Sequence, residues 1–241
     1  MKMVRWGDGG PGLRSIDWEL DWEHCLRAEA DLQGSGALAW IAISSVVGEG
    51  RRKAVARVCE QLARRVWVNP VPDLFVDSPK PDAVGRDRLF AASGAWQVAR
   101  GPGIVVDAGT ALTVDALGVR GGKPAFLGGA IAPGPALLAR ALADGGAQLF
   151  EVQVTAQQSA LGRDTLGALR AGIGVGFQGA ARELVRRVSG EAGLGDAVVY
   201  VTGGARSLLL ADGLLDGRNV VEDPYLVHRG LLACAPGQGE S

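Results

Sequence analysis

Two short segments carry residues whose types and spacing can handle a phosphate group. In the first, an apolar run leads into Asp-Ala-Gly-Thr at residues 107–110, and alternating apolar and polar residues follow as far as Asp115. This pattern predicts a β-hairpin over 104–118. A glycine beside a threonine lets backbone N–H groups and a hydroxyl face a phosphate, while the Asp107 carboxylate can hold a cation or an ordered water.

The second segment is Gly-Arg-Asp-Arg at residues 85–88, at the start of a predicted helix over 85–99. Phosphoryl transfer to an alcohol needs a carboxylate that accepts the hydroxyl proton, and Asp87 can do this. The neighbouring guanidinium of Arg88 can hold an anionic or hydroxyl-rich substrate in a fixed geometry. Taken alone, the pair is also compatible with an exposed ion pair in the first turn of a helix.

Three further groups of residues leave alternatives open. Asp115 is either a second polar group near the phosphates or the solvent side of its strand. The glycines of Gly128-Gly129 and Pro133-Gly134 either permit a close backbone approach or form plain turns. Asp164 and Thr165 can cap a helix over 162–188, and a helix N-terminus also suits an anion or a hydroxyl.

The elements that must position these residues alternate between strands and helices, which predicts an α/β fold. We expect a hairpin over 2–22, a helix over 24–33, a strand over 37–47, a helix over 51–65, a strand over 66–70, a glycine-interrupted strand over 125–134, a helix over 135–146, a strand, glycine turn and helix within 197–214, and a closing helix over 223–234.

The segment 69–84 holds four of the eleven prolines and predicts an ordered extended loop. It is the best boundary between two domains, 1–80 and 81–241.

Composition excludes several functional classes. Lys and Arg number 25 against 26 Asp and Glu, so no excess of positive charge points to nucleic acid or to a membrane surface. The three widely spaced cysteines and the two histidines, including the adjacent His24 and Cys25, lack the ligand spacing of a zinc site. The N-terminus has no apolar signal-peptide core and no apolar run is long enough to span a membrane, which predicts a cytoplasmic protein.

Five motifs in a fixed order carry a family resemblance: GRDR at 85–88, VVDAGTALTVD at 105–115, GGAIAPGPALLARAL at 128–142, GRDTLGALRAGI at 162–173 and VYVTGGA at 199–205. Together they resemble the type III pantothenate kinases of the actin-like ATPase and sugar-kinase superfamily. The resemblance covers roughly residues 69–232 and, weakly, 37–48. It implies two ribonuclease-H-like domains with the active cleft between them, and ATP-dependent phosphorylation of pantothenate to 4′-phosphopantothenate in coenzyme A biosynthesis.

The resemblance also implies a role for individual residues. Asp87 matches the family's proton acceptor, and Asp107 matches its monovalent-cation ligand, for potassium or ammonium. The remaining matches are pantothenate binding by Gly85, Arg86, Asp87, Arg88 and Thr165, ATP-phosphate binding with magnesium by Gly109 and Thr110, and the adenosine-side turn at Gly203 and Gly204. The family builds its substrate pocket at a dimer interface, which implies a homodimer.

The beginning of the chain departs from the family pattern. Residues 1–6, Met-Lys-Met-Val-Arg-Trp, resemble the strand that follows the family's first D-x-G-N-T/S phosphate turn. We therefore expect a first domain without its N-terminal strand and phosphate loop. Either the true start lies upstream, or the protein is a catalytically impaired or regulatory member on the same fold. A kinase for another small hydroxylated acid or sugar is a third possibility, which the GRDR motif disfavours.

Overall fold

The computed structural model describes residues 2–7, 10–15, 27, 41–44, 49–155, 159–213, 215 and 217–234. The helix expected over 24–33, with His24 and Cys25, lies outside the described residues apart from Arg27.

A six-stranded mixed sheet forms the centre of the molecule, in the order β10-β9-β6-β7-β8-β5. Its strands are β5 (Phe75–Val76), β6 (Gly103–Ala108), β7 (Ala111–Arg120), β8 (Lys123–Pro133), β9 (Val198–Thr202) and β10 (Val220–Glu222). β6, β7 and β8 form an antiparallel meander. On the other side of β6, β9 pairs with it in parallel, and β10 pairs in parallel with β9. The predicted α/β class is confirmed, and this sheet has the arrangement expected of a ribonuclease-H-like domain.

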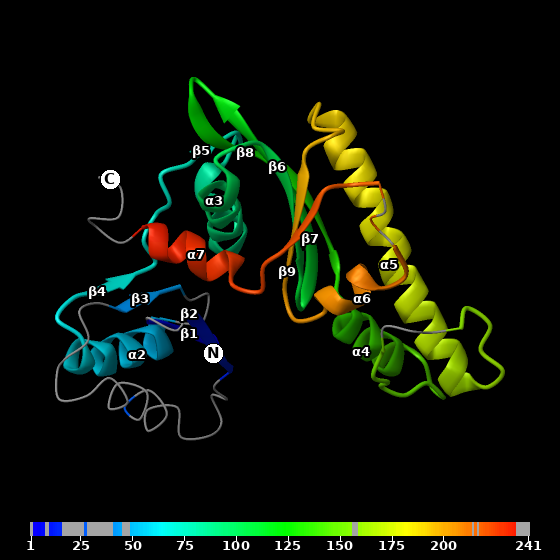
Figure 1. Ribbon diagram of the computed structural model, residues 1–241. Coiled ribbons are helices and arrows are strands. Elements are labelled where there is room, and N and C mark those ends of the chain that lie inside the picture. The colour runs from blue at the N-terminus through cyan, green and yellow to red at the C-terminus, as the bar shows by residue number, and fades with distance from the viewer. Residues whose placement is uncertain are drawn as a thin grey trace.

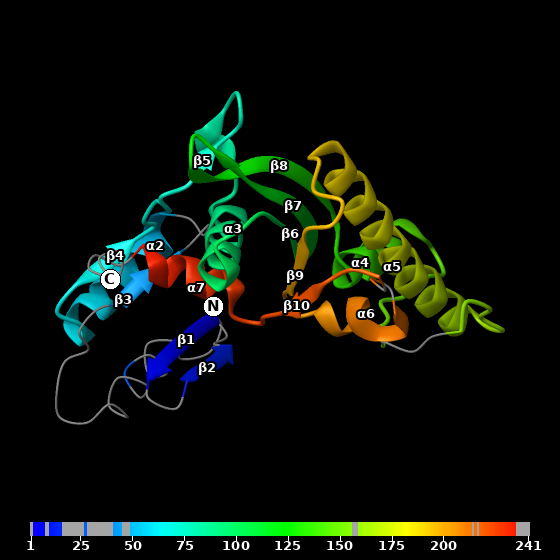
Figure 2. The same ribbon diagram turned by 45° about the horizontal axis from the view of Figure 1, so that its top comes forward.

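The side chains of each strand alternate between two apolar layers. On β6, Ile104 and Val106 enter one buried cluster, whereas Val105 enters the other. Helix α5 (Thr165–Glu191) covers the first face, with α6 (Arg206–Leu210) beside it and α4 (Pro135–Gly145) packed against it. Helices α3 (Arg86–Ala99) and α7 (Leu226–Ala233) cover the second face, as Figures 1 and 2 show. The sheet is therefore covered on both sides.

Helices α3 and α7 cross at a contact between two glycines. A Cβ on Gly94 would overlap the carbonyl group of Leu226, and one on Gly230 would overlap that of Phe90. The middle of α3 is thus held by backbone-to-backbone packing on α7.

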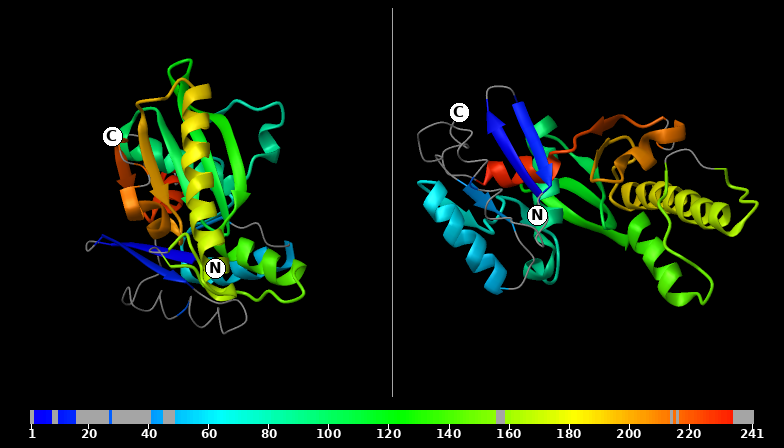
Figure 3. Two further views of the ribbon diagram at one scale, coloured as in Figure 1. Left: turned by 90° about the vertical axis from the view of Figure 1, so that its right-hand side faces the viewer. Right: turned by 90° about the horizontal axis from the view of Figure 1, so that it is seen from below.

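The N-terminal part forms two small sheets. β1 (Lys2–Gly7) and β2 (Gly10–Ser15) make an antiparallel hairpin, which confirms the first part of the hairpin expected over 2–22. β3 (Ile41–Ile43) pairs in parallel with β4 (Val66–Val68), and α2 (Glu49–Leu62) packs on them through residues such as Val55, Val58 and Cys59. Figure 3 shows both sheets at the α7 end of the molecule, away from α5.

Several elements differ from the sequence expectations. The proline-rich segment contains β5, which pairs with β8, and a short 3-10 helix, η1 (Pro81–Ala83), so it is more than a loop. Strand β10 was not predicted, and a second 3-10 turn, η2 (Ala211–Gly213), follows α6. The domain boundary near residue 80 stays a prediction, since β5 lies before it and joins the later sheet. Among the helices described, none is long and apolar enough to cross a lipid bilayer.

Replacing Tyr200 with phenylalanine is expected to stabilise the fold. The Tyr200 side chain is fully buried, and its hydroxyl has no hydrogen-bond partner among the described residues. Removing this unsatisfied hydroxyl should raise the free energy of unfolding by about 1 kcal/mol, measured by urea denaturation. A lower free energy of unfolding in Tyr200→Phe would show that the hydroxyl is satisfied in solution.

The same tyrosine predicts a loss of stability in alkaline solution. Burial raises the pKa of Tyr200 above its ordinary value of 10.0, so the unfolded chain releases this proton first. Stability should therefore fall as the pH rises above 10, and Tyr200→Phe should lack that part of the loss.

Candidate active site

Three turns meet at the end of the β6–β7 hairpin. Within the hairpin, the Gly109 N–H donates to the Ala111 carbonyl at 2.9 Å. The turn after β9 is joined to it by a hydrogen bond from Ala205 N–H to the Ala108 carbonyl at 2.8 Å. The turn after β8 is joined by one from Gly134 N–H to the Thr110 carbonyl at 3.0 Å. The predicted ATP-binding turns at 109–110 and 203–204 therefore lie side by side, with Thr110 exposed.

Gly203 is required where it stands. Its φ of +93° is one that residues with a side chain rarely adopt, and a Cβ there would lie 2.5 Å from the Ala108 carbonyl and would overlap the Asp107 carboxylate. Gly134 is a second position where two backbone segments approach closely, since a Cβ at this residue would lie 2.6 Å from the Thr110 carbonyl oxygen. Of the alternatives left open for the glycines, close backbone approach is confirmed at Gly129 and Gly134, whereas a Cβ at Gly128 would meet no atom within 4 Å.

Gly203→Ala is expected to lower the free energy of unfolding by about 1–3 kcal/mol, because it adds both backbone strain and a steric overlap. Gly204→Ala is the matched control, since a Cβ at Gly204 meets no atom within 4 Å. Thermal or urea denaturation of the two variants measures the difference. Equal stability would mean that the two turns are less tightly apposed than the structure has them.

Asp107 lies among oxygen-bearing residues at the carboxyl end of β6. It is partly buried and stands opposite Thr113 on β7 and Thr202 on β9, both of which are buried. Residues in register on neighbouring strands project to the same face, so a carboxylate and two hydroxyls share this position. Such oxygen donors suit a hard cation.

The GRDR motif begins helix α3. Gly85 is the N-cap, and Asp87 lies in the first turn with its side chain exposed. A Cβ on Gly85 would lie 2.7 Å from Asp87 Oδ1, so the carboxylate turns back over the start of the helix. Arg86, the first residue of α3, lies near Cys234: burial raises the pKa of the Cys234 thiol to about 11, and the charge of Arg86 opposes this rise.

Arg88 joins the GRDR motif to the sheet through Asp115. Its Nε donates to the two carboxylate oxygens of Asp115 at 3.1 and 3.2 Å, and its Nη2 donates to Oδ1. The guanidinium also lies 5.1 Å from the centre of the Phe126 ring. Asp115 has no exposed surface, so the interpretation that placed it on the solvent side of its strand is wrong. Burial raises the pKa of Asp115, and Arg88 opposes that effect.

Thr165 is not brought to the GRDR motif within one chain. Asp164 caps helix α5 by accepting a hydrogen bond from Gly167 N–H at 2.6 Å, as the sequence predicted, and Thr165 is the exposed first residue of that helix. Because α5 and α3 cover opposite faces of the sheet, the two motifs lie apart (Figure 1).

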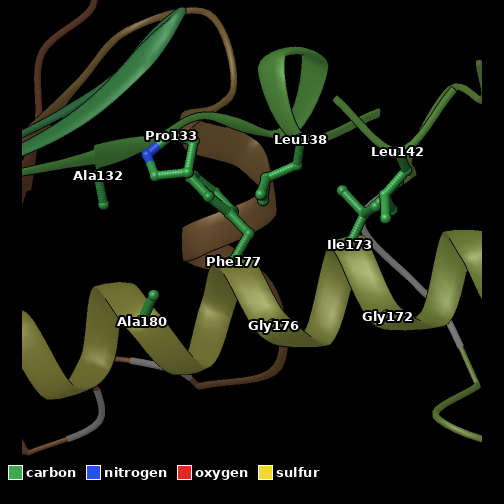
Figure 4. Close-up of a pocket in the computed structure, with 9 residues that line it drawn as sticks. All are labelled: Ala132, Pro133, Leu138, Leu142, Gly172, Ile173, Gly176, Phe177 and Ala180. Atoms are coloured by element: carbon green, nitrogen blue, oxygen red, sulfur yellow. The ribbon is translucent and has the colours of Figure 1, made fainter. Parts of the chain in front are cut away.

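A pocket of about 320 Å³ opens between α4, α5 and the end of β8, as Figure 4 shows. Its walls are Ala132, Pro133, Leu138, Leu142, Gly172, Ile173, Gly176, Phe177 and Ala180. It contains no charged side chain and none of the predicted site residues. Its chemistry therefore does not suit an anionic substrate.

Comparison with known proteins places the chain in a family. The family model described as type III pantothenate kinase matches residues 19–187. The chain belongs to the type III pantothenate kinase family. The Hyphomonas neptunium type III pantothenate kinase is 32% identical over 241 residues, covering 95% of this chain and 88% of the relative.

Other type III pantothenate kinases match a shorter part of the chain. The Agathobacter rectalis protein is 34% identical over 157 residues, covering 65% of this chain and 58% of the relative. The Streptomyces coelicolor protein is 36% identical over 160 residues, covering 66% and 57%. The chain thus spans less than two thirds of the length of these relatives.

Two solved structures match most of this chain at low sequence identity and low TM-score. The archaeal actin homologue Ta0583 has a TM-score of 0.42 and 13% identity, covering 93% of this chain and 80% of its own. The Alp12 filament has a TM-score of 0.46 and 11% identity, covering 86% and 72%.

Proposed function

We propose that this chain transfers a phosphoryl group from ATP to pantothenate, giving 4′-phosphopantothenate, the first step of coenzyme A biosynthesis. Family membership supports a kinase that uses these two substrates. One structural observation carries the proposal furthest. The Arg88–Asp115 pair ties the GRDR motif to β7. β7 is the second strand of the β6–β7 hairpin, whose turn is the proposed phosphate site and which is called the phosphate hairpin below. A candidate proton acceptor and a candidate phosphate site are thus joined through one set of hydrogen bonds.

On the pantothenate side, Asp87 accepts the proton of the primary hydroxyl as that oxygen bonds to phosphorus. Its exposure leaves the carboxylate open to a substrate. Gly85 and Arg86 contribute to the pantothenate site beside it. Arg88 gives two of its nitrogens to Asp115, so Nη1 is the part of its guanidinium that remains for the substrate.

On the ATP side, the exposed hydroxyl of Thr110 lies at the hairpin turn and holds the phosphates, which bring a magnesium ion with them. Gly109 contributes to this site as the small residue of the turn, since its N–H already bonds to the Ala111 carbonyl. The turn at Gly203 and Gly204 accepts the adenosine end. Asp107, with the oxygens around it, would hold potassium or ammonium, and such an ion would offset the negative charge of the phosphates.

Thr165 acts on pantothenate from a second copy of the chain in this proposal. It is exposed and lies on the opposite side of the sheet from Asp87 within one chain. A homodimer that presents α5 of one copy to α3 of the other would bring the two together. The proposed setting is the cytoplasm, where both substrates are available.

A coupled assay of ADP release tests the proposal. With ATP and magnesium, we expect turnover that depends on pantothenate and that falls when potassium is replaced by sodium. The same assay with other small hydroxylated acids and sugars tests the substrate. Turnover with one of these and none with pantothenate would contradict the proposal.

A second arm of the assay uses a chain lengthened by the in-frame codons upstream of Met1. Turnover confined to the longer chain would contradict the proposal for this chain and would show that the reaction needs residues preceding Met1. Pantothenate-independent ADP release in both chains would count against a pantothenate kinase.

A further inference from the structure

The first turn of α3 is held differently from the rest of the helix. Beyond it, Leu89, Ala92 and Ala95 are buried against the sheet, and Gly94 lies against α7. In the first turn, the N-cap is Gly85, which provides no side-chain capping hydrogen bond, and Asp87 is exposed. Among the described residues, the side-chain hydrogen bonds that tie this turn to the sheet are therefore those of Arg88.

That contact has the geometry of a fixed support. Two nitrogens of Arg88 bond to the Asp115 carboxylate, and only 14% of the Arg88 side chain is exposed. A two-nitrogen contact of this kind fixes the orientation of the guanidinium as well as its distance. The ring of Phe126 lies against one face of the guanidinium and covers that face.

Asp115 is itself held in one place. It is fully buried on β7, and a hydrogen bond from Thr113 supports its carboxylate. Gly129 on β8 faces it, and a Cβ at Gly129 would overlap both the Val114 carbonyl and the Asp115 carboxylate. Pairing of β7 with β6 and with β8 holds Asp115 in place, and the same β6–β7 pairing forms the hairpin whose turn contains Thr110.

We propose that Asp115 is a positioning residue: through Arg88 it sets the place of the first turn of α3, and so of Asp87, relative to the phosphate hairpin. Asp115 does not touch a substrate in this scheme. Its effect on the reaction rests on the proposed function, whereas its effect on the helix turn does not.

The test compares Asp115→Asn with Asp223→Asn. The control also replaces a buried carboxylate that accepts from an arginine Nε, that of Arg229. Asp223 lies between β10 and α7, and its hydrogen-bond donors, Arg229 and the Tyr225 N–H, belong to the start of α7 and not to the first turn of α3. A third variant, Arg88→Lys, keeps the charge and loses the two-nitrogen geometry. Each variant is measured for kcat, for the KM of ATP and pantothenate, and for hydrogen exchange in a peptide covering residues 85–92.

We expect kcat to fall by about tenfold to a hundredfold in Asp115→Asn, since a small displacement of a reacting group is enough for this. The KM of ATP should stay unchanged, and hydrogen exchange should rise in the first turn of α3 alone. Arg88→Lys should lie between this variant and the wild type. Asp223→Asn should keep the wild-type kcat and the wild-type exchange in that turn.

Any of three kinetic results would overturn the proposal: an unchanged kcat in a folded Asp115→Asn, an equal loss of kcat in Asp223→Asn, or a rise in the KM of pantothenate with unchanged kcat in Asp115→Asn. If the wild type does not phosphorylate pantothenate, the proposed function fails, and hydrogen exchange alone then tests whether Asp115 positions the first turn of α3. Unchanged exchange in the first turn of α3 would overturn the positioning role by itself.

Discussion

Asp87→Asn is expected to lower kcat by about 10²–10⁴-fold while ATP binding stays intact. Asparagine keeps the size and shape of the side chain but cannot accept the hydroxyl proton. Asp87 is exposed, and within the described part of the chain its side chain forms no hydrogen bond or ion pair with the sheet, so the variant should unfold at the wild-type temperature. Steady-state kinetics give kcat, and calorimetric titration with a non-hydrolysable ATP analogue gives the affinity.

Asp196→Asn is the matched control for this prediction. Asp196 is an exposed aspartate that precedes β9, at the opposite end of that strand from Gly203. Its replacement should leave kcat unchanged. If Asp87→Asn loses ATP binding together with turnover, Asp87 supports the nucleotide site and the role of proton acceptor is wrong.

Arg88→Ala is expected to lower the free energy of unfolding by about 3–5 kcal/mol, because it leaves the fully buried carboxylate of Asp115 without its partner. Arg186→Ala is the matched control. Arg186 also pairs with a carboxylate, that of Glu183, but both side chains are exposed, so stability should hardly change. Urea denaturation of both variants measures the contrast.

A double variant separates the two causes of this loss. In Arg88→Ala combined with Asp115→Asn, no buried charge remains, so the destabilisation should be smaller than the sum of the single effects. Losses that simply add would mean that Arg88 stabilises the fold through its contact with Phe126 alone.

The pH dependence of Arg88→Ala gives an independent check. Burial already raises the pKa of Asp115 above its ordinary value of 3.8, and the loss of Arg88 removes the interactions that lower it. A carboxyl whose pKa is raised in the folded state costs stability as the pH rises past 3.8, because the unfolded chain releases the proton first. The variant should therefore be closer to the wild type near about pH 4 than at neutral pH.

The β6–β7 hairpin could be predicted from sequence because its pattern is local. An apolar strand, a turn with Gly109 and a second strand fix β6 and β7 to within a few residues of the predicted bounds. The long helices α3 and α5 were found for the same reason, and Asp164 caps α5 as predicted. Local chemistry of this kind does not depend on what lies across the sheet.

The buried state of Asp115 could not be predicted, because it depends on a helix that is distant in sequence. Alternating residues on β7 suggest one apolar face and one exposed face, yet helices cover both faces of this sheet. Arg88 and Asp115 meet only when α3 lies on β7. The short strands β5 and β10 were missed for a related reason, since two or three residues carry too little pattern to be recognised alone.

Direct detection of the product tests the central claim, that this chain phosphorylates pantothenate with Asp87 as the proton acceptor. Phosphorus NMR and mass spectrometry of a reaction with ATP, magnesium and potassium should show one phosphomonoester on pantothenate for each ADP formed, and Asp87→Asn should form almost none. No phosphomonoester from the wild-type chain, or an equal rate from Asp87→Asn, would contradict it.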